Sequence, residues 1–129
     1  IEVTGSVIGN EMLEALPVVE IRPEKGHEFF DFNAKYTKNA AKEICPAHID
    51  EDLTIMAKDC AKKAHRVLFC KGYSRTDMII KKEKIYILET NTIPGMTTNS
   101  LLPIAAKNSG ISFSRLLDIL IELSIKERG

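Results

Sequence analysis

Excess charge is the first thing this sequence lacks, because 18 Lys and Arg residues balance 18 Asp and Glu residues and leave a formal net charge of zero at pH 7. Binding to nucleic acid or to an anionic membrane surface draws on an excess of basic residues, so the composition favours neither partner. The sequence also lacks an apolar run near the roughly 20 residues of a membrane span and a signal-peptide pattern at its start. We therefore expect a soluble, cytoplasmic protein.

The cysteines and glycines of this sequence show none of the spacings that are typical of metal sites or phosphate-binding loops. Cys45, Cys60 and Cys70 are odd in number and lack the Cys-x-x-Cys spacing of a metal site, so we expect reduced thiols that fill the core. The chain contains no Gly-rich phosphate loop.

The sequence does contain enough apolar residues for one compact domain, since 44% of its 129 residues are hydrophobic. Strands are predicted over residues 2–8 and 16–21, and a glycine at position 5 marks a weak point or a close backbone approach in the first strand. Residues 33–46 are polar without a helical or strand period, which predicts a long loop.

Three helices follow the loop in the predicted order. Asp50 is the expected N-cap of the first, which ends at Gly72, and a hairpin separates it from the other two. Its predicted apolar face consists of Leu53, Met56, Ala57, Cys60, Ala61, Ala64, Val67 and Leu68. The second helix begins near Leu101, and the third is capped by Ser112 or Ser114. Hairpins in place of crossovers indicate an α+β fold in which helices cover an antiparallel sheet.

The most informative feature is a predicted hairpin that brings two carboxylates together. Its strands are residues 75–80 and 85–91, and a turn centred on Glu83 would place Asp77 opposite Glu89, with Asn91 further along the same face. Two carboxylates at roughly 4 Å repel by about 4 kcal/mol at an effective dielectric near 20, and a bound cation removes that conflict. Two carboxylates and an amide oxygen suit Mg²⁺ or Mn²⁺ rather than Zn²⁺. The alternative is a solvated acidic pair on the surface.

A second element follows the hairpin directly. A Pro-Gly turn at Pro94 leads to a segment with helix-start signals, in which Asn99 or Ser100 can be the N-cap and Pro103 falls in the first turn. The free amides at a helix N-terminus bind anions. A metal site and an anion site a few residues apart favour a functional interpretation over an ordinary capped helix.

These motifs carry a family resemblance. Residues 74–77 (SRTD) and 88–102 (LETNTIPGMTTNSLL), together with residues 29–36 (FFDFNAKY) and 45–47 (CPA), resemble D-alanine:D-alanine ligases of the ATP-grasp superfamily. The likeness runs nearly from end to end. It implies the C-terminal lobe of an ATP-grasp fold, ATP and Mg²⁺ as cofactors, and D-alanine as the substrate.

The resemblance also implies roles for the hairpin residues. Asp77, Glu89 and Asn91 match the ligands of two Mg²⁺ ions, with Glu89 bridging, and Mn²⁺ is an accepted substitute. Arg75 lies two residues before Asp77, so strand alternation points both side chains to the same face. Its guanidinium suits a phosphate or a developing oxyanion; the alternative is a structural salt bridge to Asp77.

Three further residues, two in the long polar loop and one shortly before it, match nucleotide-binding or catalytic positions of the family. By resemblance Lys35 reaches the terminal phosphate, Tyr36 hydrogen-bonds toward the substrate domain, and Phe29 is a wall of the adenine pocket. The tyrosine favours D-alanine over D-lactate as the second substrate.

The other matches lie at the start of the chain and around the Pro-Gly turn. Glu2 matches the residue that accepts hydrogen bonds from the ribose, and Leu88 matches part of the adenine floor. Gly95 offers its amide near the tetrahedral centre, whereas Ser100 and Leu101 hold the carboxylate of the second D-alanine. For Leu88 and Phe29 a plain core role is an equal alternative.

The resemblance leaves the histidines and part of the enzyme unaccounted for. His27, His48 and His65 match no catalytic position and are expected in loops or on a helix surface, so no general base for the amine is identified.

Residues 1–129 resemble only the C-terminal part of the family's ATP-grasp domain, without the N-terminal substrate domain and the small nucleotide lobe. We therefore expect a fragment that does not catalyse ligation alone and that needs the missing N-terminal portion as its partner. The sequence gives no oligomeric state.

Two other functional interpretations remain open. A different ATP-grasp enzyme that joins another carboxylate and amine would share Asp77, Glu89 and Asn91. A non-catalytic nucleotide-binding module would bind Mg²⁺ and ATP in a way that does not depend on Arg75.

Overall fold

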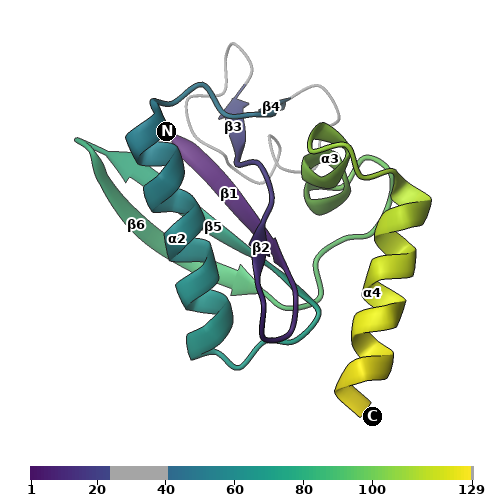
Figure 1. Cartoon of the computed structure of the whole chain (residues 1–129). Helices are drawn as coiled ribbons and strands as arrows, with labels where there is room; N and C mark the ends of the chain where they lie inside the picture. The colour runs from purple at the N-terminus through teal and green to yellow at the C-terminus, as the bar shows by residue number, and fades with distance from the viewer. Residues whose placement is uncertain (24–40, 129) are drawn as a thin grey trace.

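The computed structural model describes residues 1–23 and 41–128, and within them six strands form one sheet in which every pairing is antiparallel. The order along the sheet is β4-β3-β1-β5-β6, and β2 pairs with β1 off this path. The helix Glu51–Val67 lies across this sheet, and the last two helices lie beside it (Figure 1). The α+β prediction of an antiparallel sheet covered by helices is confirmed. The elements are β1 (Glu2–Ile8), β2 (Glu14–Ala15), β3 (Val19–Pro23), β4 (Ala41–Ile44), α2 (Glu51–Val67), β5 (Tyr73–Lys81), β6 (Lys84–Asn91), α3 (Leu101–Asn108) and α4 (Phe113–Arg128).

The two faces of the sheet pack against different helices. Residues that pair across antiparallel strands project to the same face. The register therefore shows on which face of the sheet each paired side chain lies. One face, the α2 face, carries Val3, Val7 and Met78 against Ala57 and Ala61 of α2. The opposite face, the site face, carries Glu2, Thr4, Arg75, Asp77, Glu89 and Asn91. At one end of the site face, residues of β1 and β3 pack against α3 and α4 through Ile8, Val19, Leu102, Ala105 and Leu116.

Gly5 lies where β1 passes directly under α2. A Cβ atom at this position would come within 2.9 Å of the Ala61 Cβ and 3.1 Å of the Met78 Cε. The close backbone approach predicted from this glycine is therefore confirmed. The absence of a side chain lets the helix lie flat on the strand.

Replacing Gly5 with Ala is expected to lower the free energy of unfolding by about 1–3 kcal/mol, because the added methyl group overfills a packed interface. Chemical denaturation of this chain, followed by circular dichroism, measures the change. The double variant Gly5→Ala/Ala61→Gly restores the space and should lose less stability than the sum of the two single variants. Simple additivity of the two losses would contradict the packing explanation.

The hairpin of β5 and β6 has a different turn from the predicted one. Lys81 pairs with Lys84, and the two residues between them, Lys82 and Glu83, have positive φ angles of 51° and 63°, as in a two-residue type I′ turn. The predicted turn centred on Glu83 is therefore wrong. A bulge between Asp77 and Met78 shifts the register by one residue and leaves Leu88 as the extra residue of β6.

Other boundaries also differ from the sequence prediction. The second long strand is β3 (Val19–Pro23) rather than residues 16–21, and β4 (Ala41–Ile44) lies inside the segment predicted as loop. The helix α2 ends at Val67, with Leu68 as its C-cap, rather than at Gly72. Its N-cap is confirmed, because the Leu53 amide donates to Asp50 Oδ1 at 2.8 Å.

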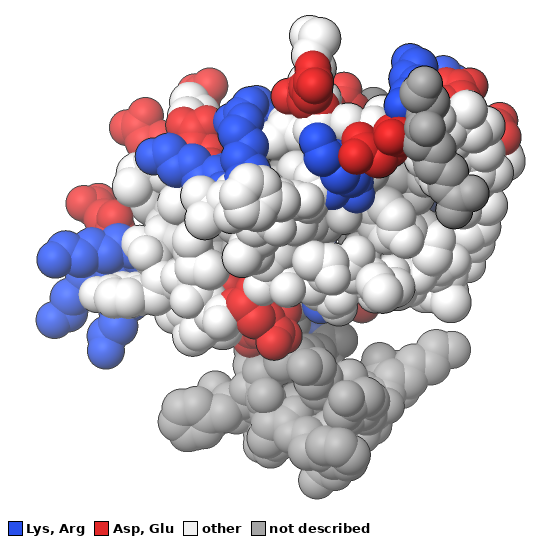
Figure 2. All heavy atoms as spheres, turned by 90° about the horizontal axis from the view of Figure 1, so that it is seen from below, with Lys and Arg blue, Asp and Glu red and all other residues white. Residues whose placement is uncertain are grey.

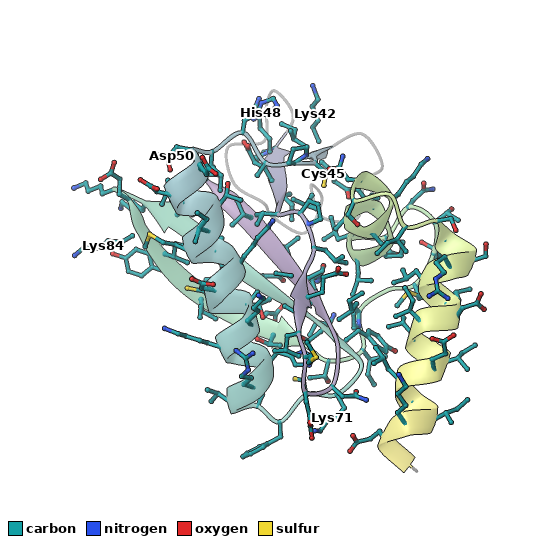
Figure 3. All side chains as sticks on the ribbon, in the orientation of Figure 1. Lys42, Cys45, His48, Asp50, Lys71 and Lys84 are labelled. Carbon is teal, nitrogen blue, oxygen red and sulfur yellow. The ribbon has the colours of Figure 1, made fainter. Side chains whose placement is uncertain are left out.

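The buried stripe of α2 is narrower than the predicted apolar face. Ala57, Ala61 and His65 are its buried residues, one turn apart, whereas Met56, Val67 and Leu68 are 45%, 72% and 55% exposed. Figure 3 shows Asp50 at the start of α2 and Lys71 just beyond its other end. Because two of the three buried residues are alanines, the helix packs on the sheet largely through small side chains.

His65 is fully buried, so its predicted place on a helix surface is wrong. Its Nδ1 lies 2.7 Å from the Ser74 hydroxyl and its Nε2 lies 3.0 Å from the Gly9 carbonyl oxygen. A carbonyl oxygen can only accept, so Nε2 carries the proton and Nδ1 accepts from the serine. The neutral imidazole therefore joins α2 to β5 and to the end of β1.

The stability of the fold is expected to fall below about pH 6.5 because of His65. Burial lowers the pKa of His65, with Arg66 and Lys71 acting in the same direction and the Gly9 hydrogen bond opposing them. The unfolded chain then takes up the proton first as the pH falls, at a cost of at most about 1.4 kcal/mol per pH unit. Denaturant titrations at pH 7.5 and pH 5.5 measure the loss. The variant His65→Gln should lose this pH dependence, whereas His48→Gln, at an exposed position, should keep it.

Candidate functional site

The centre of the site face is an ion pair between neighbouring positions of β5. The Arg75 Nε lies 3.3 Å from Asp77 Oδ1, and the two side chains are 15% and 13% exposed. Thr4, directly opposite Asp77 in β1, donates its hydroxyl to the same carboxylate oxygen at 2.8 Å. The prediction that Arg75 and Asp77 project to the same face is confirmed, and the salt bridge between them is present.

Strand β6 brings the other two predicted metal ligands to this face. Asp77 pairs with Glu89, and Arg75 pairs with Asn91. The predicted facing of the two carboxylates is thus confirmed, although the bulge rather than the turn sets it. The Glu89 side chain is exposed, and the Asn91 Oδ1 accepts a hydrogen bond from the Ile93 amide at 3.1 Å, which fixes the orientation of this oxygen as the chain leaves the strand.

The donor set fits a hard divalent cation that keeps part of its own hydration. Two carboxylates and one amide oxygen supply oxygen ligands, as Mg²⁺ and Mn²⁺ prefer. Within residues 1–23 and 41–128, no group of three or more His, Cys, Asp or Glu side chains gathers to hold a metal. An ion at Asp77 and Glu89 would therefore depend on further oxygens from water or from phosphate groups, which is the usual coordination of Mg²⁺ beside a nucleotide.

The N-terminus of α3 forms the second part of the site. Of the two predicted candidates, Asn99 and Ser100, the N-cap residue is Ser100, but its side chain makes no capping hydrogen bond. Its hydroxyl instead lies 2.7 Å from the Thr97 hydroxyl and accepts from the Thr97 amide at 3.1 Å. The amides at the start of α3, with Leu101 first, therefore have no side-chain partner from the N-cap and remain suited to an anion.

Gly95 belongs to the same loop and lies close to Ser100. A Cβ atom on Gly95 would come within 2.9 Å of the Ser100 Oγ. A side chain at residue 95 would therefore require the Ser100 hydroxyl to move from this position. This contact links two of the predicted substrate-binding positions.

The predicted nucleotide-binding residues are only partly covered by the structure. Glu2 pairs with Ile79 and Ile21, which places it on the site face two residues along β1 from Thr4. Leu88 is the bulge residue and is 53% exposed, so it is not a core residue of this chain. Phe29, Lys35 and Tyr36 lie outside the described residues, and so does His27.

Sequence reasoning missed two residues of this face, Thr4 and Glu43. Glu43 pairs with Ile21 in β4, which places it on the site face. Partial burial of its carboxyl group raises the pKa of Glu43, while the charge of Arg75 lowers it. Glu43 was hidden because β4 reads as loop, and Thr4 because a threonine in a strand carries no signal of its own.

The surface of the molecule carries charges of both signs. Figure 2 shows Lys and Arg side chains interspersed with Asp and Glu side chains, and neither sign forms a continuous field among the coloured atoms of that face. No helix among the described residues is long and apolar enough to cross a membrane.

Comparison with known protein families decides the assignment. The family model described as D-ala D-ala ligase C-terminus matches residues 1–122 of this chain. The chain belongs to this family. The family resemblance of the motifs is thus confirmed over nearly the whole chain, and so is the ATP-grasp type of fold.

Curated relatives of the family are similar in sequence but much longer. The D-alanine--D-alanine ligase of Syntrophobacter fumaroxidans is 58% identical over 127 residues, which are 98% of this chain and 41% of that protein. The ligase of the same name from Desulfotalea psychrophila is 50% identical over 127 residues, or 98% of this chain and 39% of the relative. The chain thus spans about two fifths of the length of these relatives.

Solved structures of the family have the same fold. The D-alanine--D-alanine ligase from Bacillus anthracis in complex with ATP is 31% identical, with a TM-score of 0.77 over 98% of this chain and 37% of that one. The D-Ala:D-Ser ligase VanG from Enterococcus faecalis is 38% identical, with a TM-score of 0.77 over 95% of this chain and 35% of that one. The same lobe therefore occurs in family members that differ in the second substrate of their names.

Proposed function

We propose that this chain is the C-terminal lobe of a longer ATP-dependent ligase, which joins two D-alanines through a D-alanyl phosphate for peptidoglycan precursor synthesis. The observation that carries the proposal is the convergence of Arg75, Asp77 and Glu89 on one face of the hairpin. Relatives of up to 58% identity carry the name of this activity, and a similar structure was solved with ATP.

The acidic part of the site would hold the cations that accompany ATP. Asp77, Glu89 and Asn91 would bind two Mg²⁺ or Mn²⁺ ions, with the Glu89 carboxylate shared between them. Bound cations neutralise the negative charge on the phosphate oxygens, and phosphoryl transfer depends mainly on this neutralisation. The bulge supports this role, because it keeps Glu89 opposite Asp77 on a strand that could otherwise turn it away.

The remaining described residues would orient the substrates. Arg75 would direct its guanidinium to the transferred phosphate and to the oxyanion of the tetrahedral intermediate. Gly95 would donate its amide near that centre, while Ser100 and Leu101 would hold the carboxylate of the second D-alanine. The uncapped start of α3 supports this assignment.

The nucleotide itself would lie along the edge of the site face. Glu2 would accept hydrogen bonds from the ribose, and Leu88 and Phe29 would contact the adenine. Lys35 would reach the terminal phosphate, and Tyr36 would hydrogen-bond toward the substrate domain.

Two further parts of the proposed enzyme would lie outside this chain. The substrate domain and the small nucleotide lobe would come from an N-terminal portion of the same enzyme, which accounts for the two-fifths share of the relatives' length. Because the reaction consumes ATP, the enzyme would work in the cytoplasm.

A chimera tests the proposal. This chain replaces the matching stretch of the Syntrophobacter fumaroxidans ligase, and we expect D-alanyl-D-alanine, ADP and phosphate from D-alanine, ATP and Mg²⁺. The 129-residue chain alone should release no phosphate. A chimera that folds and binds ATP but forms no dipeptide would refute the proposed activity.

Two alternatives are outcomes of the same experiment. The similarity to a D-Ala:D-Ser ligase makes D-serine a second candidate for the accepting substrate, so D-serine, D-lactate and other carboxylate and amine pairs are compared with D-alanine in the chimera. A non-catalytic nucleotide-binding module would bind Mg²⁺ and ATP without turnover. For that alternative, the Arg75 and Asp77 ion pair would have only a structural role.

A further inference from the structure

The carboxylate of Asp77 receives two donors on the same oxygen atom. Thr4 donates its hydroxyl to Oδ1 at 2.8 Å, and Arg75 directs Nε to Oδ1 at 3.3 Å. Among the described residues, no hydrogen bond or ion pair ends on Oδ2. The two oxygens of one carboxylate therefore have different surroundings.

Thr4 is held in place more firmly than Arg75. It lies in β1, which has a partner strand on each side, directly opposite Asp77, and it is fully buried. Its side chain is β-branched, so the strand backbone restricts its χ1 angle. The position of its hydroxyl is thus fixed by the fold.

The hydroxyl has one proton and two acceptors within reach. Its Oγ1 lies 3.2 Å from the Thr76 carbonyl oxygen and 2.8 Å from Asp77 Oδ1. A hydrogen bond to an ionised carboxylate is shorter and about twice as strong as one between neutral groups. The Thr4 hydroxyl therefore donates its hydrogen bond mainly to the Asp77 carboxylate.

We propose that Thr4 is a positioning residue for the metal-binding carboxylate of Asp77. Thr4 and Arg75 together hold Oδ1, so that Asp77 presents Oδ2 to the divalent cation as a single-oxygen ligand. The proposal deepens the proposed function and rests on it for the identity of the ion. Partners of metal-binding carboxylates typically change metal affinity by about 10–100-fold when they are removed.

The substitution Thr4→Val tests this role, because valine keeps the shape of the side chain and removes only the hydroxyl. The experiment uses the chimera and measures Mn²⁺ binding in the presence of ADP by electron paramagnetic resonance. We expect the Mn²⁺ dissociation constant to rise about 10-fold for Thr4→Val and to stay within about 2-fold for Thr4→Ser. If Thr4→Val does not fold, as judged by circular dichroism, Thr4→Ala is measured against Thr4→Ser in its place.

A double-mutant cycle separates positioning from general stability. In the Asp77→Asn background, Thr4→Val should change Mn²⁺ affinity by less than about 2-fold, because the carboxylate it orients is gone. Equal losses in both backgrounds, or a Thr4→Val variant that binds Mn²⁺ like the unsubstituted chimera, would overturn the role of Thr4.

Failure of this inference differs from failure of the proposed function. A chimera that joins D-alanines but does not need the Thr4 hydroxyl for Mn²⁺ binding contradicts only the inference. A chimera that binds Mn²⁺ through Asp77 and Thr4 but forms no dipeptide contradicts only the activity.

Discussion

Replacing Arg75 with Ala in the chimera is expected to lower kcat/KM for D-alanyl-D-alanine formation by at least about 100-fold, while ATP still binds. The Arg75 side chain is only 15% exposed, and its guanidinium points along the site face toward Asp77, where the transferred phosphate would lie. Removing one preorganised donor to a developing negative charge typically costs about 3 kcal/mol of transition-state stabilisation. Steady-state kinetics and calorimetric titration with ATP measure the two properties.

Two comparisons separate a direct role of Arg75 in catalysis from a role in holding Asp77 through the ion pair. Arg115 pairs with Glu122 on the exposed surface of α4, so Arg115→Ala should leave kcat/KM nearly unchanged. If Arg75 only held Asp77 in place, a higher Mg²⁺ concentration should restore the Arg75→Ala variant. Full recovery at high Mg²⁺ would contradict a direct role of the guanidinium.

The variant Glu89→Gln should lose activity by at least about 100-fold, and its loss should be accompanied by weaker Mn²⁺ binding. The substitution keeps the size of the side chain but removes the charge that the two cations would share, and cation neutralisation contributes several kcal/mol to such reactions. Because Glu89 is exposed, the fold should tolerate the change. Kinetics at a series of Mg²⁺ concentrations measure the effect.

The hairpin itself provides the matched control. Glu83 is an exposed carboxylate in the turn, on the far side of the bulge, so Glu83→Gln removes the same charge from the same hairpin. We expect less than a 2-fold change. Equal sensitivity at positions 83 and 89 would indicate a general charge effect instead of a metal site.

The sequence predicted the pairing of Asp77 with Glu89 correctly, but through the wrong turn. A two-residue turn in an unbroken ladder would pair Asp77 with Leu88, and the bulge adds the one residue that restores the pairing with Glu89. Alternation of side chains showed which residues share a face, because this period belongs to every strand. Bulges have no comparable pattern, so this part of the register could not be predicted.

The misplaced elements share a physical cause, which is that local sequence does not reveal long-range partners. The strand β4 has polar residues such as Lys42 and Glu43 and depends on its pairing with β3. His65 is polar in isolation and is buried only because Ser74 and Gly9 satisfy both ring nitrogens. By contrast, the caps at Asp50 and Ser112 act within a single turn; Asp50 was predicted, and Ser112 was one of the two candidates predicted for the last helix.

The bulge at Leu88 also separates the proposed adenine contact from the proposed metal ligands. Since the ladder pairs Ile87 with Met78 and Glu89 with Asp77, loss or exchange of the residue between them would leave the carboxylates facing each other. The residue at position 88, and with it the proposed adenine surface, could therefore be exchanged or lost without separating the two proposed metal ligands.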